Sequence, residues 1–351
     1  MPQILEVAYA KKLFDAPDDR KVHTQAIPSL GGVGVGFGAI IALLFWAPAG
    51  ITGDMKFVFV ALLFLFVMAI KDDLVPMEAL PKLIIQIGAA SLVVGSGLWL
   101  NRGFGILGIQ AIPAWIGMPL SVLLLVGITN AFNLIDGIDG LAGGLGGINC
   151  LTLGSILWVL GETEYAVLSF GISGALLAFL RFNFNSYPKK MFMGDTGSLL
   201  LGFAVAVFSL KIVVANPLSY GSFRLVSPPL FVLGVILIPV LDLVRVAILR
   251  ISKGKSPFSP DKTHVHHELL KFGLSHGKAS AIIYLANLLL VSLMFGLREY
   301  EAPFLGISLV LFGSLATQLF IVVRYYGQQK RIHTLDQRLT EFNQDNQFIS
   351  R

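Results

Sequence analysis

The segment MPLSVLLLVGITNAFNLIDGIDGL, residues 118–141, joins an apolar run to two amides and two carboxylates. The amides are Asn130 and Asn133, and the carboxylates are Asp136 and Asp139, so a polar side chain recurs every three residues. A carboxylate at the centre of a membrane helix costs about 3 kcal/mol even on the lenient insertion scales. These residues therefore require either a position at the membrane surface or partners that offset the cost.

The composition is that of a polytopic membrane protein. The 351 residues are 55% hydrophobic and only 13% charged, with a mean hydropathy of +0.77, whereas soluble domains carry roughly 25% charged residues. We therefore predict an all-α polytopic integral membrane protein. The net charge of +5 indicates basic cytoplasmic loops and an anionic substrate rather than nucleic-acid binding. Cys150 is the only cysteine, which excludes a disulfide within the chain and a thiolate metal site.

Ten apolar segments predict about ten transmembrane helices, since a span needs about 20 residues. They lie near residues 33–50, 56–71, 82–100, 118–135, 141–160, 164–182, 197–215, 228–250, 279–297 and 303–324. The preceding Ile4–Phe14 is too short to span and does not resemble a signal peptide. Residues 101–117 predict a short outer hairpin. We assign residues 1–325 to one membrane domain and residues 326–351 to a polar cytoplasmic tail.

The distribution of lysine and arginine predicts the orientation. With the N-terminus in the cytoplasm, the outer loops hold only Lys56, Arg102, Arg224 and Arg298, with Lys211 near the end of a span. All other basic residues then lie on the cytoplasmic side, including the cluster in residues 245–278.

Five polar segments fall on this cytoplasmic side. They contain Arg20, Lys21 and His23; Asp72, Asp73 and Lys82; residues 130–141; Asn183, Asn185 and Asp195 within residues 183–198; and His264, His266 and His267 within residues 256–267. Aspartates without cysteine indicate a hard cation such as Mg²⁺ or Mn²⁺. Histidines and cations beside them indicate phosphate oxygens. Together they predict one composite site for phosphoryl transfer, with a lipid phosphate as one substrate.

Each segment also has a simpler interpretation. Asp72 and Asp73 resemble an ordinary acidic loop, Asp195 a helix N-cap, and the two Asp-Gly pairs of residues 136–140 resemble turns. The three histidines are compatible with a solvated loop or a zinc site, and the basic residues near position 20 with the positive-inside bias alone. These interpretations do not explain why all five segments share one side of the membrane. We expect Gly137 and Gly140 to end the helix and to turn Asp139 back toward the site.

The motifs resemble those of the polyprenyl-phosphate N-acetylhexosamine-1-phosphate transferases. The resemblance covers residues 14 to about 275 and rests on residues 15–23 (DAPDDRKVH) with 27–32 (IPSLGG), the Asp72-Asp73 pair, residues 130–141, residues 192–198 (FMGDTGS) and the His-x-His-His pattern of residues 264–267. It implies transfer of a sugar 1-phosphate from a UDP-sugar to a polyprenyl phosphate in the plasma (inner) membrane, with release of UMP, dependence on Mg²⁺ and a cytoplasmic active site.

The resemblance also implies roles for individual residues. The catalytic residues would be Asp72, which contacts or deprotonates the lipid phosphate, together with Asp73 and Asp195. The metal ligands would be Asp195, Asp73 and Asp136. The substrate-binding residues would be Asn133, Asp136, Asp139, His264, His266, His267, Lys82, Arg20, Lys21 and His23. A homodimer is compatible with this prediction.

Two branches of this family compete. Residues 27–32 and the spaced histidines resemble the WecA-like branch, which uses UDP-GlcNAc and starts O-antigen, teichoic acid or capsule. The alternative is the phospho-MurNAc-pentapeptide transferase of peptidoglycan synthesis. Outside the family, the rivals are a secondary transporter with intramembrane carboxylates and a homologue that has lost activity.

The sequence departs from the family pattern in two places. Family members usually carry an apolar span before the Arg-Lys-x-His segment, whereas here only Met1–Ala10 takes its place, which predicts ten spans instead of eleven or a late start codon. Glu78 and Leu80 stand where the family often has serine and a basic residue.

Overall fold

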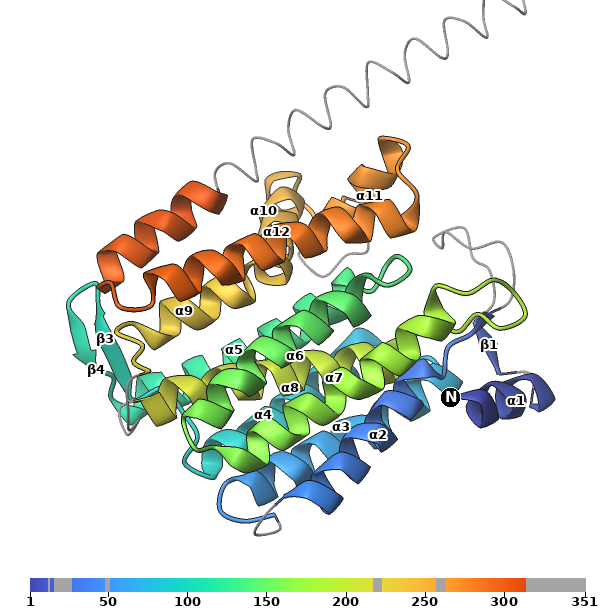
Figure 1. Cartoon of the computed structure of the whole chain (residues 1–351), viewed down its shortest axis with the longest axis horizontal. Coiled ribbons are helices and arrows are strands. Elements are labelled where there is room, and N and C mark those ends of the chain that lie inside the picture. Colours follow the sequence, from blue (N-terminus) through green and yellow to red (C-terminus); the bar gives the residue numbers. More distant parts are fainter. Residues whose placement is uncertain (12, 16–26, 48–50, 217–222, 257–262, 314–351) are drawn as a thin grey trace, which may run out of the picture.

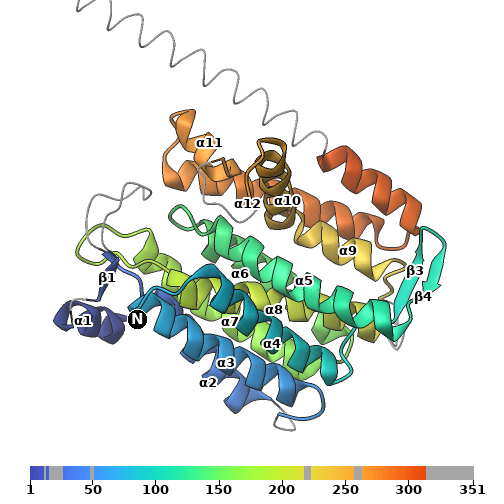
Figure 2. The same cartoon turned by 180° about the vertical axis from the view of Figure 1, so that it is seen from behind.

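The computed structural model describes residues 1–11, 13–15, 27–47, 51–216, 223–256 and 263–313. These residues form a bundle of long helices that run roughly parallel or antiparallel to one another (Figures 1 and 2). The chain begins with α1 (Pro2–Ala10) and a two-residue strand pair, β1 (Phe14–Asp15) with β2 (Ile27–Pro28). The predicted tail lies outside the described residues, as does the end of the tenth apolar segment.

Helices fill the apolar segments because a chain in lipid must satisfy its own backbone hydrogen bonds. The helices of the first half are α2 (Gly31–Trp46), α3 (Met55–Leu74), α4 (Ala79–Gly95), α5 (Ala114–Ile135) and α6 (Leu141–Val159). Those of the second half are α7 (Thr163–Asn183), α8 (Gly194–Ala215), α9 (Pro228–Val235), α10 (Leu237–Ser252), α11 (Val265–Lys271), α12 (His276–Leu297) and a last helix over Ala302–Gly313. Each of the ten predicted segments coincides with a helix in the described residues, which confirms a polytopic membrane protein.

By length and apolarity, fewer of the described helices qualify as membrane spans than there are apolar segments in the sequence. Within the described residues, α5, α6, α7, α8 and α12 are long and apolar enough to cross a membrane, and α9 with α10 adds one span if the pair is counted together. The apolar helices α2, α4 and Ala302–Gly313 are shorter. Helix α3 has 20 residues, with Lys56 near its start and three charged residues near its end. The total of ten spans therefore remains a prediction.

Helix α8 is the centre of the bundle. Nearly every residue from Thr196 to Ala215 is buried, and the helix contacts α2, α3, α5 and α6. Small residues permit the closest approach: a Cβ on Gly32 of α2 would lie 2.0 Å from the backbone nitrogen of Gly197 in α8. Close packing of this kind stabilises helix pairs in lipid, where hydrophobicity does not drive them together.

The segment 228–250 forms two helices in place of one continuous helix. Helices α9 and α10 meet at Ile236 with a bend of 79°. Pro239 accounts for the break, because proline has no backbone N–H and its ring clashes with the carbonyl four residues earlier, that of Val235.

One end of the bundle carries a β-hairpin, and ion pairs of a single lysine join helices near it. Strand β3 (Arg102–Ile106) pairs antiparallel with β4 (Ile109–Ala111), which confirms the predicted hairpin. Near this end, Nζ of Lys211 lies 2.8 Å from Asp54 and 3.1 Å from Glu162. These ion pairs join α8 to the start of α3 and to the α6–α7 loop.

Candidate active site

The predicted polar segments gather at the other end of the bundle. The α5–α6 loop, the α7–α8 loop and α11 lie at the end opposite to the β3–β4 hairpin (Figure 1). Asp72 and Asp73 lie near the end of α3, and Lys82 lies near the start of α4. The remaining predicted segment lies outside the described residues, with Arg20, Lys21 and His23.

Lys82 holds together two carboxylates from different helices. Its Nζ contacts Oδ2 of Asp72 and lies 2.8 Å from Oδ2 of Asp195. Asp72 is only 4% exposed, and its Oδ1 accepts a hydrogen bond of 2.7 Å from the backbone N–H of Met77. Two close carboxylates in a partly buried place repel each other, so the lysine supplies the charge that keeps them adjacent.

Asp73 and Asn133 fix the position of Asp195. The backbone N–H of Asp195 donates to Oδ1 of Asp73 at 2.8 Å, and Thr196 donates to Oδ2 through its N–H at 3.1 Å and its hydroxyl at 2.5 Å. Asp73 of α3 therefore caps the first turn of α8, whose N–H groups have no carbonyl within their own helix. Nδ2 of Asn133 donates to Oδ1 of Asp195 at 3.1 Å and to Oγ of Ser198 at 2.9 Å.

The alternative that Asp195 is itself the N-cap is wrong. Helix α8 begins at Gly194, so Asp195 lies inside the first turn, and the capping oxygens come from Asp73. Gly194 has φ +71°, and a Cβ there would lie 2.2 Å from the carbonyl oxygen of Ser29 and 2.6 Å from Oδ2 of Asp73. Glycine is required at this position because the backbone is left-handed and the carboxylate approaches it closely.

Asp136 is the carboxylate of this site that has no partner in the described part of the chain. It follows the last residue of α5, and none of the described residues donates a hydrogen bond to it. Burial, followed by the nearby carboxylates of Asp195, Asp73 and Asp139, raises the pKa of Asp136 to about 7. The site therefore carries an excess of negative charge around this side chain.

Asp139 is held by a lysine and a histidine from distant elements. Its Oδ2 lies 2.6 Å from Nζ of Lys190 in the α7–α8 loop and 3.1 Å from Nδ1 of His276 at the start of α12. Burial alone would raise the pKa of Asp139, but the hydrogen bonds from His276 and Lys190 outweigh it and lower that pKa. The predicted turn is confirmed: α5 ends at Ile135, and Gly140 precedes α6 with φ +81°.

The three histidines occupy different environments. Nδ1 of His264 lies 2.8 Å from Oδ2 of Asp242 in α10. The His266 ring stacks on that of His264 with centroids 5.7 Å apart, and it rests against Gly137, where a Cβ would lie 2.1 Å from its Nε2. His266 is 1% exposed, neither ring nitrogen has a hydrogen-bond partner among the described residues, and burial lowers its pKa to about 3. His266 is therefore neutral at physiological pH.

The described residues of the site do not form a complete set of protein ligands for a metal ion. Among the described residues, no three histidine, cysteine, aspartate or glutamate side chains are arranged to hold an ion by themselves. The zinc alternative for the histidines finds no support there. Mg²⁺ differs from zinc, because it is usually held by one or two carboxylates together with water and the phosphates of the substrate. The Asp136 carboxylate fits that description, since none of the described residues places a cation beside it.

Comparison with known proteins agrees with this geometry. Residues 55–213 match the family described as Glycosyl transferase family 4. A probable undecaprenyl-phosphate N-acetylglucosaminyl 1-phosphate transferase of Bacillus subtilis (strain 168) is 37% identical, over 81% of this chain and 77% of the relative. The chain belongs to glycosyl transferase family 4. The family resemblance seen in the sequence is thereby confirmed.

Further members of glycosyl transferase family 4 show the same relation. A decaprenyl-phosphate N-acetylglucosaminephosphotransferase of Mycolicibacterium smegmatis is 38% identical, over 77% of this chain and 71% of the relative. An undecaprenyl-phosphate alpha-N-acetylglucosaminyl 1-phosphate transferase of Escherichia coli (strain K12) is 32% identical, over 82% and 77% respectively.

The glycosyl transferase family 4 match ends before several residues that complete the site. Asp242, His264 and His276 all lie beyond residue 213. Sequence reasoning missed Asp242, Lys190 and His276 as site residues. The cost of a carboxylate in an apolar segment could have revealed Asp242, whereas Lys190 and His276 carry no signal of their own, because their partner is 51 and 137 residues away.

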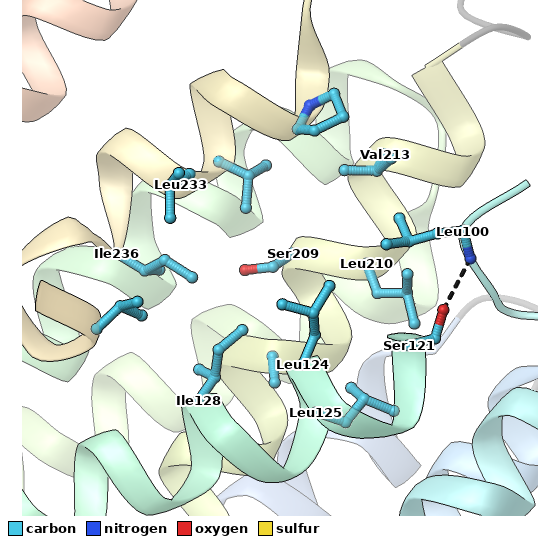
Figure 3. Close-up of a pocket in the computed structure, with 14 residues that line it drawn as sticks. Leu100, Ser121, Leu124, Leu125, Ile128, Ser209, Leu210, Val213, Leu233 and Ile236 are labelled. Atoms are coloured by element: carbon cyan, nitrogen blue, oxygen red, sulfur yellow. Dashed lines mark hydrogen bonds between the residues drawn. The ribbon is translucent and has the colours of Figure 1, made fainter. Parts of the chain in front are cut away.

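An apolar cavity of about 130 Å³ opens among α5, α8, α9 and α10 (Figure 3). Its walls include Leu124, Ile128, Leu210 and Ile236. Oγ of Ser209 points into this space and has no hydrogen-bond partner among the described residues. A cavity lined in this way suits a hydrocarbon chain and offers little to a polar ligand.

Proposed function

We propose that this protein transfers N-acetylglucosamine 1-phosphate from UDP-GlcNAc to a polyprenyl phosphate and releases UMP. The names of its relatives in glycosyl transferase family 4 support this donor and this class of acceptor. The observation that carries the proposal is the network of Asp72, Lys82 and Asp195, which joins three helices at one end of the bundle. A site at this end of the bundle would be accessible both to a lipid phosphate at the membrane surface and to a soluble nucleotide.

The reaction forms one P–O bond and breaks another. An oxygen of the acceptor phosphate attacks the β-phosphorus, which bears the sugar, and the bond from that phosphorus to the oxygen bridging it to the α-phosphate breaks. The acceptor oxygen is already largely ionised at neutral pH, so the protein mainly has to position it. Asp72 orients the acceptor phosphate, and Lys82, which already neutralises two carboxylates, provides the cation for it.

Mg²⁺ fits the carboxylates of this site. Asp195, Asp73 and Asp136 are the residues that would hold it, with the substrate phosphates as further ligands. When bound, the cation neutralises the charge that develops on the departing UMP. Asp73 contributes by fixing the backbone of Asp195, and Asn133 by orienting the Asp195 carboxylate.

The apolar cavity supports a lipid acceptor. Helix α5 lines the cavity through Ile128 and reaches Asp195 through Asn133. These two residues lie five positions apart, which is about 8 Å along a helix. The cavity would take part of the polyprenyl chain while the phosphate reaches the polar end of the bundle.

The site and the helices together support a topology of ten spans. Each apolar segment coincides with a helix, and the lysine and arginine distribution favours a cytoplasmic N-terminus. The active site would then lie at the cytoplasmic face of the plasma membrane. Asp72 and Asp195 lie near helix ends, which disfavours a transporter with an ion relay at the bilayer midplane.

The proposal is tested by transfer of labelled sugar phosphate from UDP-GlcNAc to undecaprenyl phosphate in purified form. Asp72→Asn and Asp195→Asn should each lower kcat by at least about a hundredfold, because they remove a charge that acts on the reacting phosphates. Lys189→Met, which changes an exposed lysine of the α7–α8 loop, is the matched control and should transfer at the normal rate. Full activity in either aspartate variant would refute the role given to that residue.

A further inference from the structure

Side chains of α12 hydrogen-bond to the turn that contains Asp136 and Asp139. His276, Ser280 and Tyr284 lie four residues apart on one face of this helix. Oγ of Ser280 donates to the carbonyl oxygen of Asp139 at 2.9 Å, and the Tyr284 hydroxyl donates to the carbonyl oxygen of Gly140. The backbone of the turn is therefore fixed before any substrate binds.

The Asp139 side chain is fixed at a single oxygen. Lys190 comes from the α7–α8 loop and His276 from α12, yet both reach Oδ2, at 2.6 Å and 3.1 Å. Asp139 is 16% exposed and Lys190 19% exposed, so this contact is largely shielded from water. Nζ of Lys190 also lies 5.5 Å from the centre of the Phe192 ring, which limits the directions open to the lysine. A charge-assisted pair of this kind is stronger than an exposed one.

We propose that Lys190 and His276 form a clamp that positions Asp139 and thereby sets the affinity of the donor site for the uridine nucleotide. Both are positioning residues, because they act through Asp139. The inference rests on the proposed function and on the substrate-binding role that the family resemblance implies for Asp139, here taken as binding of the nucleotide. It adds two residues, one from the α7–α8 loop and one from α12, that no motif of the sequence indicates.

Loss of the clamp should weaken nucleotide binding because the Asp139 side chain would no longer be held in one conformation. Without Lys190 and His276, a shielded carboxylate loses its hydrogen-bond partners and rotates toward water. Ordering of that side chain then reduces the free energy of nucleotide binding. The cost falls on donor binding, while the acceptor phosphate near Asp72 and Lys82 is unaffected.

A double-mutant cycle on UDP binding tests the clamp, because UDP is common to every UDP-sugar. Measured by calorimetry on the purified full chain, Lys190→Met and His276→Leu should each raise the Kd for UDP about tenfold, a typical coupling for residues in contact. In the Asp139→Asn background, the same substitutions should change the Kd less than about twofold. Equal effects in both backgrounds, or no effect in the wild-type background, would overturn the clamp.

Conservative variants separate positioning from a loss of folding. Lys190→Arg keeps a cation and His276→Asn keeps an N–H donor, so both should bind UDP within about threefold of the wild type. The matched controls are Lys189→Met and Lys278→Leu, which change exposed residues of the same loop and helix. In the transfer assay, the KM for UDP-GlcNAc should rise and that for undecaprenyl phosphate should stay constant. A rise in both KM values would contradict the clamp, whereas a wild-type protein inactive on UDP-GlcNAc would contradict the proposed function.

Discussion

Single side chains in this site differ mainly in how their charge is balanced. Asp72 and Asp195 share Lys82, Asp139 pairs with Lys190 and His276, and Asp136 has no partner among the described residues. The sequence predicts that carboxylates gather here but does not say which of them is neutralised. That distribution depends on contacts between residues far apart in the chain.

His266 provides a test at the level of one residue. Its pKa is lowered to about 3 in the folded protein, whereas an unfolded histidine titrates near 6.5. Between these values the unfolded chain binds more protons, so stability is complete above about pH 6.5 and falls as the pH decreases. At pH 5 the loss amounts to about 2 kcal/mol. The wild-type Tm in detergent should therefore fall more between pH 7 and pH 5 than the Tm of His266→Asn.

The comparison variant for this measurement is His267→Asn, which changes the neighbouring and less buried ring. It should keep the pH dependence of the wild type. If His266→Asn and the wild type lose the same Tm on acidification, the buried ring of His266 is not neutral in the way that its environment implies.

At the scale of the helices, the site is built from helix ends. The end of α3 meets the beginning of α8 through Asp73, and the end of α5 turns at Gly140 toward α6. The helices themselves could be predicted, because lipid leaves an apolar segment few alternatives. The break at Ile236 could have been predicted from Pro239. The capping of α8 by Asp73 could not, because a cap supplied by another helix leaves no pattern at the capped residues.

Asp73 should therefore contribute to stability as well as to the site. Asp73→Ala removes the acceptor for the backbone N–H groups of Asp195 and Thr196, and loss of an N-cap costs about 1–2 kcal/mol. We expect the Tm to decrease in the order wild type, Asp73→Asn, Asp73→Ala, because asparagine keeps one acceptor oxygen. Lys71→Ala, at an exposed position of the same helix, should leave the Tm unchanged. An Asp73→Ala variant as stable as the wild type would show that α8 does not depend on this cap.

At the scale of the whole molecule, the bundle has a polar end and a hairpin end. The gathering of polar segments at one end was predictable from the distribution of lysine and arginine together with an even number of spans. The partners of each side chain within that end were not, because packing in three dimensions brings α12 and the α7–α8 loop to the same carboxylate. Arg20, Lys21 and His23 remain predicted members of the site.

Labelling with a membrane-impermeant maleimide tests this orientation. Cys150 is fully buried, so a Cys150→Ala background gives little unwanted reaction. Leu107→Cys places a thiol at the hairpin, where the side chain is 93% exposed, and should react in intact spheroplasts. Lys189→Cys, at the polar end, should react only after the membrane is permeabilised. The reverse pattern would place the active site on the outer face.

The central claim is the transfer of a sugar phosphate to a lipid phosphate, and one measurement addresses it most directly. Purified protein is mixed with Mg²⁺, undecaprenyl phosphate and one UDP-sugar at a time, and UMP is quantified. We predict UMP from UDP-GlcNAc, no UMP when the lipid phosphate is omitted, and little UMP from UDP-MurNAc-pentapeptide. UMP formed only from UDP-MurNAc-pentapeptide, or formed from UDP-GlcNAc without any lipid phosphate, would contradict the proposed function.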